Sequence, residues 1–208
     1  MTATTAADFD PTAYGPAVAA VLEPSRLAEL GPGQPNLAQR ERLEQLSIAT
    51  LLDGREVRDV AMGSACLAGL WLYHDFFDES HAISQDLATT TGSYWHGILH
   101  RREPDYGNAK YWFRRVGQHP VFDRLVVAAR EIAPAAPSGG LDAPARYLVE
   151  QKCWDPLRFV DLCETAARGS QGELARLCRQ IQLREWQTLF DYCYRSAVQP
   201  AARSPANL

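Results

Sequence analysis

Residues 57–79 carry apolar side chains on nearly every side of the helix that they would form. Such a helix has to be buried, because each of its faces would otherwise expose a large hydrocarbon surface to water. The residues concerned are Val57, Val60, Met62, Cys66, Leu67, Leu70, Trp71, Leu72, Tyr73, Phe76 and Phe77. The rest of the chain is therefore expected to fold around this segment and cover it.

The covering elements are predicted to be helices as well. The chain contains no run of alternating β-branched residues of the kind that marks a half-buried strand. Apolar residues recur instead at helical intervals between glycines, prolines and capping residues, with Ser93 and Asp105 each starting a helix. Residues 80–92 are polar and rich in threonine, which favours a loop. Helices are expected at 16–23, 36–52, 57–79, 93–103, 105–116, 120–132, 154–167 and 171–197.

The sequence thus predicts an all-α, single-domain multi-helix bundle of six to eight helices around the buried central helix at about 57–79. A chain of 208 residues with 46% hydrophobic residues is suited to one domain with a sizeable core. We expect the helical domain to span 16–197, with a Pro/Gly-rich linker at 133–144. Residues 1–15 and 198–208 are expected to be a flexible N-terminus and a flexible tail.

Charge, cysteine usage and hydropathy point to a soluble cytoplasmic protein. The net charge of −4 makes nucleic acid an unlikely partner, because general nucleic-acid binders carry a basic excess. Five cysteines without a CxxC pair favour a reducing compartment. The N-terminus lacks a signal-peptide pattern, and no apolar stretch reaches the roughly 20 residues that a membrane helix needs. Self-association into a homo-oligomer remains open.

All five histidines lie between residues 74 and 119. Histidine is the side chain best suited to bind transition metals or to transfer protons near neutral pH. This segment is therefore where we expect chemistry. The histidines are His74, His81, His96, His100 and His119.

The sharpest pattern is His96, His100 and Glu103, which share one face of the predicted 93–103 helix. Two imidazoles one turn apart and a carboxylate can ligate a divalent transition metal, or can act as acid–base groups. The alternative is a set of half-buried polar residues satisfied by hydrogen bonds. A zinc-protease motif is excluded, because Gly97 follows the first histidine where that motif needs glutamate.

A second candidate group lies at the end of the 57–79 helix. His74 and Asp78 are four residues apart, as are Asp75 and Glu79, so each pair shares a helix face. Carboxylates this close can shift each other's pKa or hold a cation. A solvated helix end is the alternative, although acidic residues at a helix C-terminus oppose its dipole. We take His74, Asp78 and His119 as further catalytic candidates beside the first pattern.

Cationic and polar residues follow the histidines and predict a ligand-binding surface. Arginine forks bind carboxylates and phosphates, and a helix start with exposed amides attracts anions. A small anionic molecule beside the histidines is therefore expected. In the alternative, the same cations form structural ion pairs with nearby acidic residues. The predicted ligand-binding residues are Arg101, Tyr106, Asn108, Lys110, Arg114 and Arg115.

The segment SHAISQ…GSYWHGILHRREPDYGNAKYWFRRVGQHPVF, with WDPLRFVDLCE and REWQTLFDYCYR, resembles an uncharacterised family of bacterial proteins with related fungal sequences. The resemblance spans about residues 55–197. It implies that the histidine-rich segment is the family's signature, and it implies no activity, because none is assigned to that family.

Two functions remain after these observations. The first is an enzyme with a His/carboxylate site, operating through a divalent transition metal or through acid–base groups, and an Arg-lined pocket for a small anionic substrate. The second is a non-catalytic helical binding or scaffold protein, which would use the same cleft for a peptide, a metabolite or a partner subunit.

Overall fold

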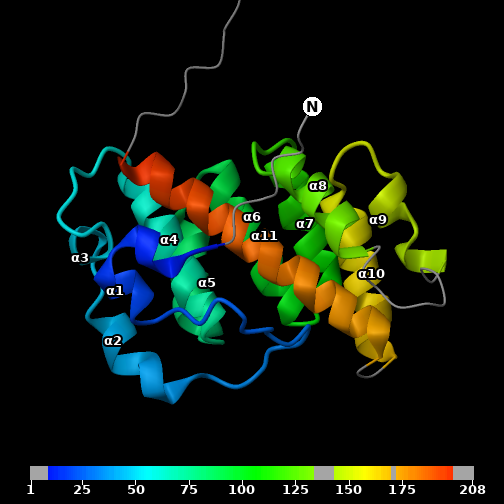
Figure 1. Ribbon diagram of the computed structural model, residues 1–208, viewed down its shortest axis with the longest axis horizontal. Coiled ribbons are helices and arrows are strands. Elements are labelled where there is room, and N and C mark those ends of the chain that lie inside the picture. Colours follow the sequence, from blue (N-terminus) through cyan, green and yellow to red (C-terminus); the bar gives the residue numbers. More distant parts are fainter. Residues whose placement is uncertain (1–8, 134–142, 170–171, 199–208) are drawn as a thin grey trace, which may run out of the picture.

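Two long helices, α4 (Val60–Tyr73) and α11 (Glu173–Val198), lie side by side in the middle of the protein (Figure 1). In this computed structural model, residues 9–133, 143–169 and 172–198 are described. Trp186 of α11 donates its indole N–H to the carbonyl oxygen of Gly69 on α4 at 2.8 Å. A Cβ on Gly69 would lie 2.8 Å from the Trp95 ring, so this glycine lets Trp95 pack closely against α4.

The described part of the chain is helical and contains no strand, which confirms the all-α prediction. Seven of its α-helices have ten or more residues, in line with the six to eight expected, and four are shorter. No helix among these residues is both long and apolar enough to cross a membrane. In chain order the other elements are η1 (Pro11–Tyr14), α1 (Pro16–Ala19), η2 (Leu37–Gln39), α2 (Arg40–Glu44), α3 (Ile48–Leu51), α5 (Phe77–Asp86), α6 (Thr90–Arg102), α7 (Tyr106–Val116), α8 (Phe122–Ile132), η4 (Ala143–Ala145), α9 (Tyr147–Glu150) and α10 (Pro156–Arg168).

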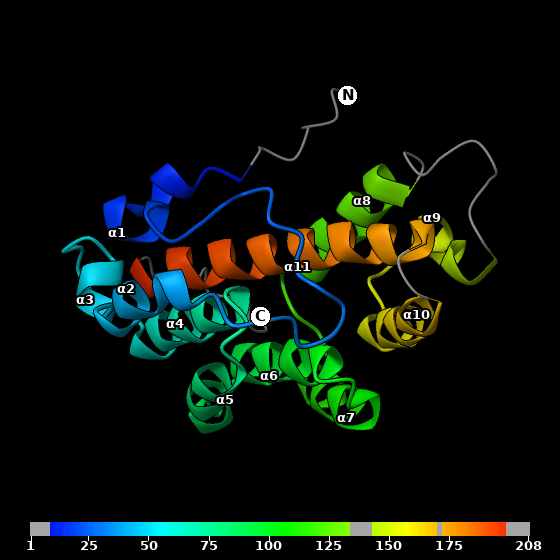
Figure 2. The ribbon, with the colours of Figure 1, turned by 90° about the horizontal axis from the view of Figure 1, so that it is seen from below.

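Helix α11 separates two groups of shorter helices, as the turned view shows (Figure 2). Helices α5, α6 and α7 follow one another on one side of it, and α1 and α8 lie on the other. Helix α5 packs against α6 and α6 packs against α7, and α10 packs on both α7 and α11. One continuous hydrophobic core joins these elements, and α6 contributes Tyr94, Trp95, Ile98 and Leu99 to it.

The expected helix at 57–79 is two helices, so its predicted bounds are wrong. Helix α4 ends at Tyr73, and Asp75 then takes a positive φ of 64°, which interrupts the helix. The buried Asp75 carboxylate is held by Arg26 at 2.6 Å and by Arg102 at 2.5 Å. The buried Arg102 and the partly buried Arg26 thus favour this unusual backbone turn over a continuous helix.

The loop expected at 80–92 is also wrong, because α5 occupies most of it. Asp78 and Glu79 stand in the first turn of α5, where acidic side chains favour the helix dipole instead of opposing it. Helix α6 starts earlier than expected, since Thr89 rather than Ser93 caps it, by accepting from the N–H of Gly92 at 2.9 Å. Asp105 caps α7 as predicted.

Only part of what was predicted for the ends of the domain and for its linker can be compared with the structure. Residues 9–15 are folded, contrary to the expected flexible start, and the buried Tyr14 donates its hydroxyl to Asp191 at 3.0 Å. The expectations for residues 1–8, for 134–142 in the linker and for 199–208 in the tail lie outside the described residues. The predicted helix at 36–52 is replaced by three short helices within the same span.

Candidate functional site

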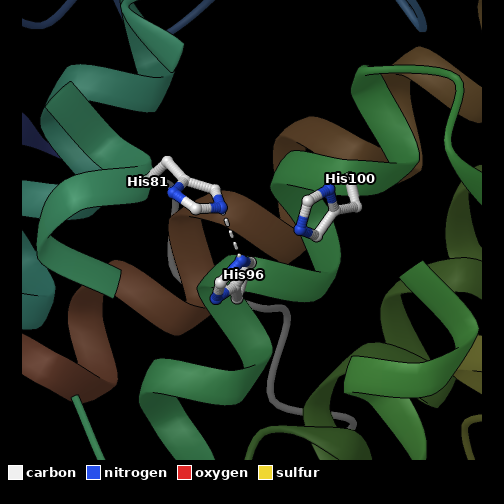
Figure 3. Close-up of side chains that lie close together, drawn as sticks. All are labelled: His81, His96 and His100. Atoms are coloured by element: carbon white, nitrogen blue, oxygen red, sulfur yellow. Dashed lines mark hydrogen bonds between the residues drawn. The ribbon is translucent and has the colours of Figure 1, made fainter. Parts of the chain in front are cut away.

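Three histidines from two neighbouring helices meet at one point (Figure 3). His81 lies on α5, and His96 and His100 lie one turn apart on α6. One ring nitrogen from each can be chosen so that all three lie within 4.8 Å of one another. The Nε2 atoms of His81 and His96 are 3.0 Å apart, and both these rings and that of His100 point toward a common space.

In this cluster, which we call the three-histidine cluster, the two α6 rings are held by stacking, and the His81 ring meets both of them edge-on. The rings of His96 and His100 are stacked with centroids 4.7 Å apart, as expected for residues one turn apart. Trp112 of α7 stacks on His96 with a centroid separation of 4.0 Å and an interplanar angle of 13°. The Arg115 guanidinium lies 5.2 Å from the centre of the Trp112 ring. Helix α7 therefore supports the cluster from one side.

His100 has a polar neighbour at each ring nitrogen. Its Nδ1 lies 2.8 Å from Oε2 of Glu103, and its Nε2 lies 3.1 Å from Nδ2 of Asn108. An ionised carboxylate can only accept, so we assign the ring proton to Nδ1. Nε2 then carries the lone pair of the ring, which can accept from the Asn108 amide and which a metal bound at Nε2 would need.

Burial keeps these imidazoles neutral. Burial, together with the charges of His100 and His81, lowers the pKa of His96 to about 4. Burial also lowers the pKa of His100, although the Glu103 carboxylate acts in the opposite direction. Nδ1 of His96 is buried and has no hydrogen-bond partner among the described residues. Both α6 histidines are therefore unprotonated near neutral pH and retain lone pairs for a metal.

A groove of about 730 Å³ opens where Glu103 ends α6. It lies between the loop at residues 32–37 and the adjoining ends of α5 and α6. Asp78, the predicted catalytic carboxylate, is exposed in this groove. Glu103 contacts His100 and also lines the groove, so it links the cluster to open solvent. The other charged residues that line the groove are Arg40, Asp75, Glu79 and Asp105.

His74 and His119 are not part of the cluster, so the structure corrects their grouping with His96 and His100. Nε2 of His74 lies 2.6 Å from the carbonyl oxygen of Val21, and its Nδ1 lies 3.3 Å from the amide of Asn36. Nε2 of His119 lies 3.1 Å from the Thr91 hydroxyl, and its Nδ1 accepts from the N–H of Val121. Both are buried, and burial lowers the pKa of each to about 4. The hydrogen bonds of His74 and His119 are therefore structural.

The predicted cationic residues do not form one pocket. Arg101 is fully buried and is paired with Glu185 at 2.5 Å, so it has no surface for a ligand. Lys110 forms an ion pair with Asp161 on α10. Arg114 is exposed on α7, whereas Arg115 lies over the Trp112 ring. Arg101 and Lys110 thus form ion pairs with acidic residues, which was the alternative to ligand binding. The anion-binding role of Arg114, Arg115 and the half-buried Tyr106 stays a prediction.

His81 is the residue that sequence reasoning missed in this site. It falls in the segment expected to be a loop, where no helical face could be assigned to it. The neighbouring pair Asp78 and Glu79 carried the missing signal, because acidic residues of this kind start helices more often than they end them. A helix starting there places His81 in its second turn.

No family model matches the chain, and no curated protein or solved structure is significantly similar to it. The resemblance to a bacterial family stays a prediction. The function is therefore inferred from the chemistry of the site alone.

Proposed function

We propose that this protein binds a divalent transition metal at the three-histidine cluster and uses it as the centre of an enzyme active site. The observation that carries the proposal is the approach of ring nitrogens from His81, His96 and His100 to within 4.8 Å of one another. Neutral imidazole nitrogens this close to one another need a proton or a cation between them. A metal ion bound by all three rings would take that place.

The size of the cluster supports a metal such as zinc. Zinc–nitrogen bonds are about 2.0–2.1 Å long, so two nitrogens on a tetrahedral ion lie about 3.3 Å apart. The 3.0 Å separation of the Nε2 atoms of His81 and His96 is close to that value. The separations to the nitrogen of His100, within 4.8 Å, would have to shorten for one ion to bind all three rings. Neutral imidazole is a ligand for zinc, copper, iron and nickel. Because the pKa of His96 is lowered to about 4, its ring is neutral near pH 7 and can bind such a metal.

The surroundings of His100 support a catalytic rather than a purely structural ion. A carboxylate on the far nitrogen of a ligating histidine fixes the ring and raises its basicity, and Glu103 occupies that position. Three protein ligands leave a fourth position for water, as in catalytic zinc sites. Metal-bound water ionises near pH 7, which suits hydrolysis or hydration. The charged residues that line the groove beside Glu103 are carboxylates with the exception of Arg40, so the groove does not favour the anionic substrate expected from the arginines.

Metal analysis tests the binding step. Untagged protein purified without chelator should contain close to one equivalent of zinc or another transition metal by mass spectrometry. His81→Ala and His100→Ala should each weaken cobalt binding at least tenfold in a visible-absorption titration. Cys153→Ser is the matched control, because Cys153 is the exposed thiol and lies outside the cluster. A metal-free protein whose melting temperature ignores added Zn²⁺, Co²⁺ and Cu²⁺ would refute the proposal.

Hydrolysis of an activated ester such as p-nitrophenyl acetate tests the catalytic step. The zinc-loaded wild-type protein should exceed both the apo protein and the His100→Ala variant in rate. Equal rates in all three, with metal bound to the wild type, would favour the alternative of a non-catalytic binding or scaffold protein.

A further inference from the structure

We propose that Asn108 orients the exogenous ligand, a water molecule or a substrate oxygen, in the fourth coordination position of the metal. This inference rests on the proposed metal centre. Among the described residues, Asn108 is the one non-histidine side chain that contacts a cluster Nε2 atom through a hydrogen bond. Its amide Nδ2 lies 3.1 Å from Nε2 of His100.

A chain of hydrogen bonds that begins at His100 fixes the position of Asn108. The backbone N–H of Asp105 donates to the carbonyl oxygen of His100 at 3.0 Å. The Asp105 carboxylate then accepts from the backbone N–H of Asn108 at 3.1 Å, as the N-cap of α7. The Asn108 side chain completes the circuit by reaching back to the His100 ring. A short turn thus holds the Asn108 amide next to the His100 ring and leaves it little conformational freedom.

One lone pair decides what happens to the amide when a metal binds. Nε2 of His100 has a single lone pair, which the Asn108 amide uses in the absence of metal. A metal takes that lone pair at a distance of about 2 Å and so displaces the amide from it. The displaced N–H donors are left beside the metal, without their former acceptor and within reach of its next ligand. They would regain a hydrogen bond by donating to the oxygen of that ligand.

This arrangement indicates a substrate class. A metal and an amide N–H that converge on one oxygen stabilise negative charge as it develops on that atom, as in hydrolysis of esters and amides. Carbonyl compounds whose oxygen becomes anionic in the reaction therefore fit the site. A small carboxylate has the same oxygen chemistry and can report binding without turnover.

The test uses the cobalt-substituted full-length protein and acetate as the probe. Asn108→Ala should leave cobalt affinity unchanged or higher, because a competitor for the His100 lone pair is gone. Its dissociation constant for acetate, from the cobalt visible spectrum, should rise about tenfold with the loss of one hydrogen bond to an anion. Asn108→Asp keeps the size of the side chain but cannot donate, so it should weaken acetate binding at least as much.

Tyr111→Phe is the control, since Tyr111 is an exposed residue of the same helix. Unchanged acetate affinity in Asn108→Ala would overturn the inference. So would a loss of cobalt affinity as large as that of His100→Ala, because Asn108 would then be a metal ligand or a support of the fold. A wild-type protein that binds no cobalt would refute the proposed function itself, which is a distinguishable result.

Discussion

Replacement of Arg101 by methionine should destabilise the protein strongly, because Arg101 and Glu185 form an ion pair with no exposed side-chain area. The guanidinium lies 2.5 Å from Oε2 of Glu185, and Oε1 of the same carboxylate accepts from the Tyr94 hydroxyl at 3.1 Å. Methionine can fill the space of the arginine stem. It leaves the Glu185 carboxylate buried without a counter-charge, however, and that loss determines the outcome.

The expected cost of Arg101→Met is about 3–5 kcal/mol, the range found when one partner of a buried pair is removed. A natural domain has roughly 5–15 kcal/mol of stability in total, so this variant should lie near the limit of folding. The double variant Arg101→Met with Glu185→Gln should be more stable than the single variant. The glutamine carries no charge and still offers an oxygen to Tyr94, so the isolated charge disappears.

Urea unfolding followed by circular dichroism at 222 nm measures these differences. With a slope of about 2–3 kcal/mol per molar urea for a protein of this size, the midpoint should fall by about 1–2.5 M in the single variant. A loss below about 1 kcal/mol, or a double variant less stable than Arg101→Met, would refute the assignment. Unchanged stability together with loss of ligand binding would instead restore Arg101 to its predicted binding role.

Three further predictions follow from the buried groups. Burial lowers the pKa of His74 and His119 from 6.5 to about 4. The unfolded chain therefore binds more protons between these values, and the stability that depends on the neutral rings is present above pH 6.5 and lost as the pH falls toward 4. The loss should reach about 3 kcal/mol per histidine in urea unfolding, and a flat profile between pH 7 and 4 would contradict this reasoning. With Ellman's reagent, Cys153 should react in the native protein, and the four buried thiols should follow only after denaturation; fast native reaction of more than one thiol would be inconsistent with the packing. Gly69→Ala should cost about 1–3 kcal/mol, because the new methyl group meets the Trp95 ring, and a neutral result in thermal unfolding would show that the ring can move.

Sequence reasoning found the local part of the candidate site and missed the rest. The shared face of His96 and His100, with Glu103 one turn further, follows from helical periodicity alone and is present in the structure. Neighbouring positions on the same helix were less well predicted, because facing the core or the site depends on what packs there. Arg101 turns into the core toward Glu185, from a segment far away in the sequence.

The break after α4 shows the same limit. In the sequence, Asp75 is one more polar residue near the expected end of a helix. Its role in ending α4 depends on ion pairs with Arg26 and Arg102, which come from separate parts of the chain. Once that turn forms, the acidic pair that follows starts a new helix, and His81 is carried toward α6. No local pattern encodes this meeting.

The sequence by itself therefore determined that the protein is helical, that most of the segment at about 57–79 is buried, and that two histidines share a helix face with a carboxylate. The tertiary structure alone decided that His81 joins them, that His74 and His119 do not, and that Arg101 is buried in an ion pair with Glu185. The physical reason is one of range. Helical periodicity is set by residues a few positions apart, whereas a metal site depends on ångström-scale distances between helices, and these are set by the packing of the whole core.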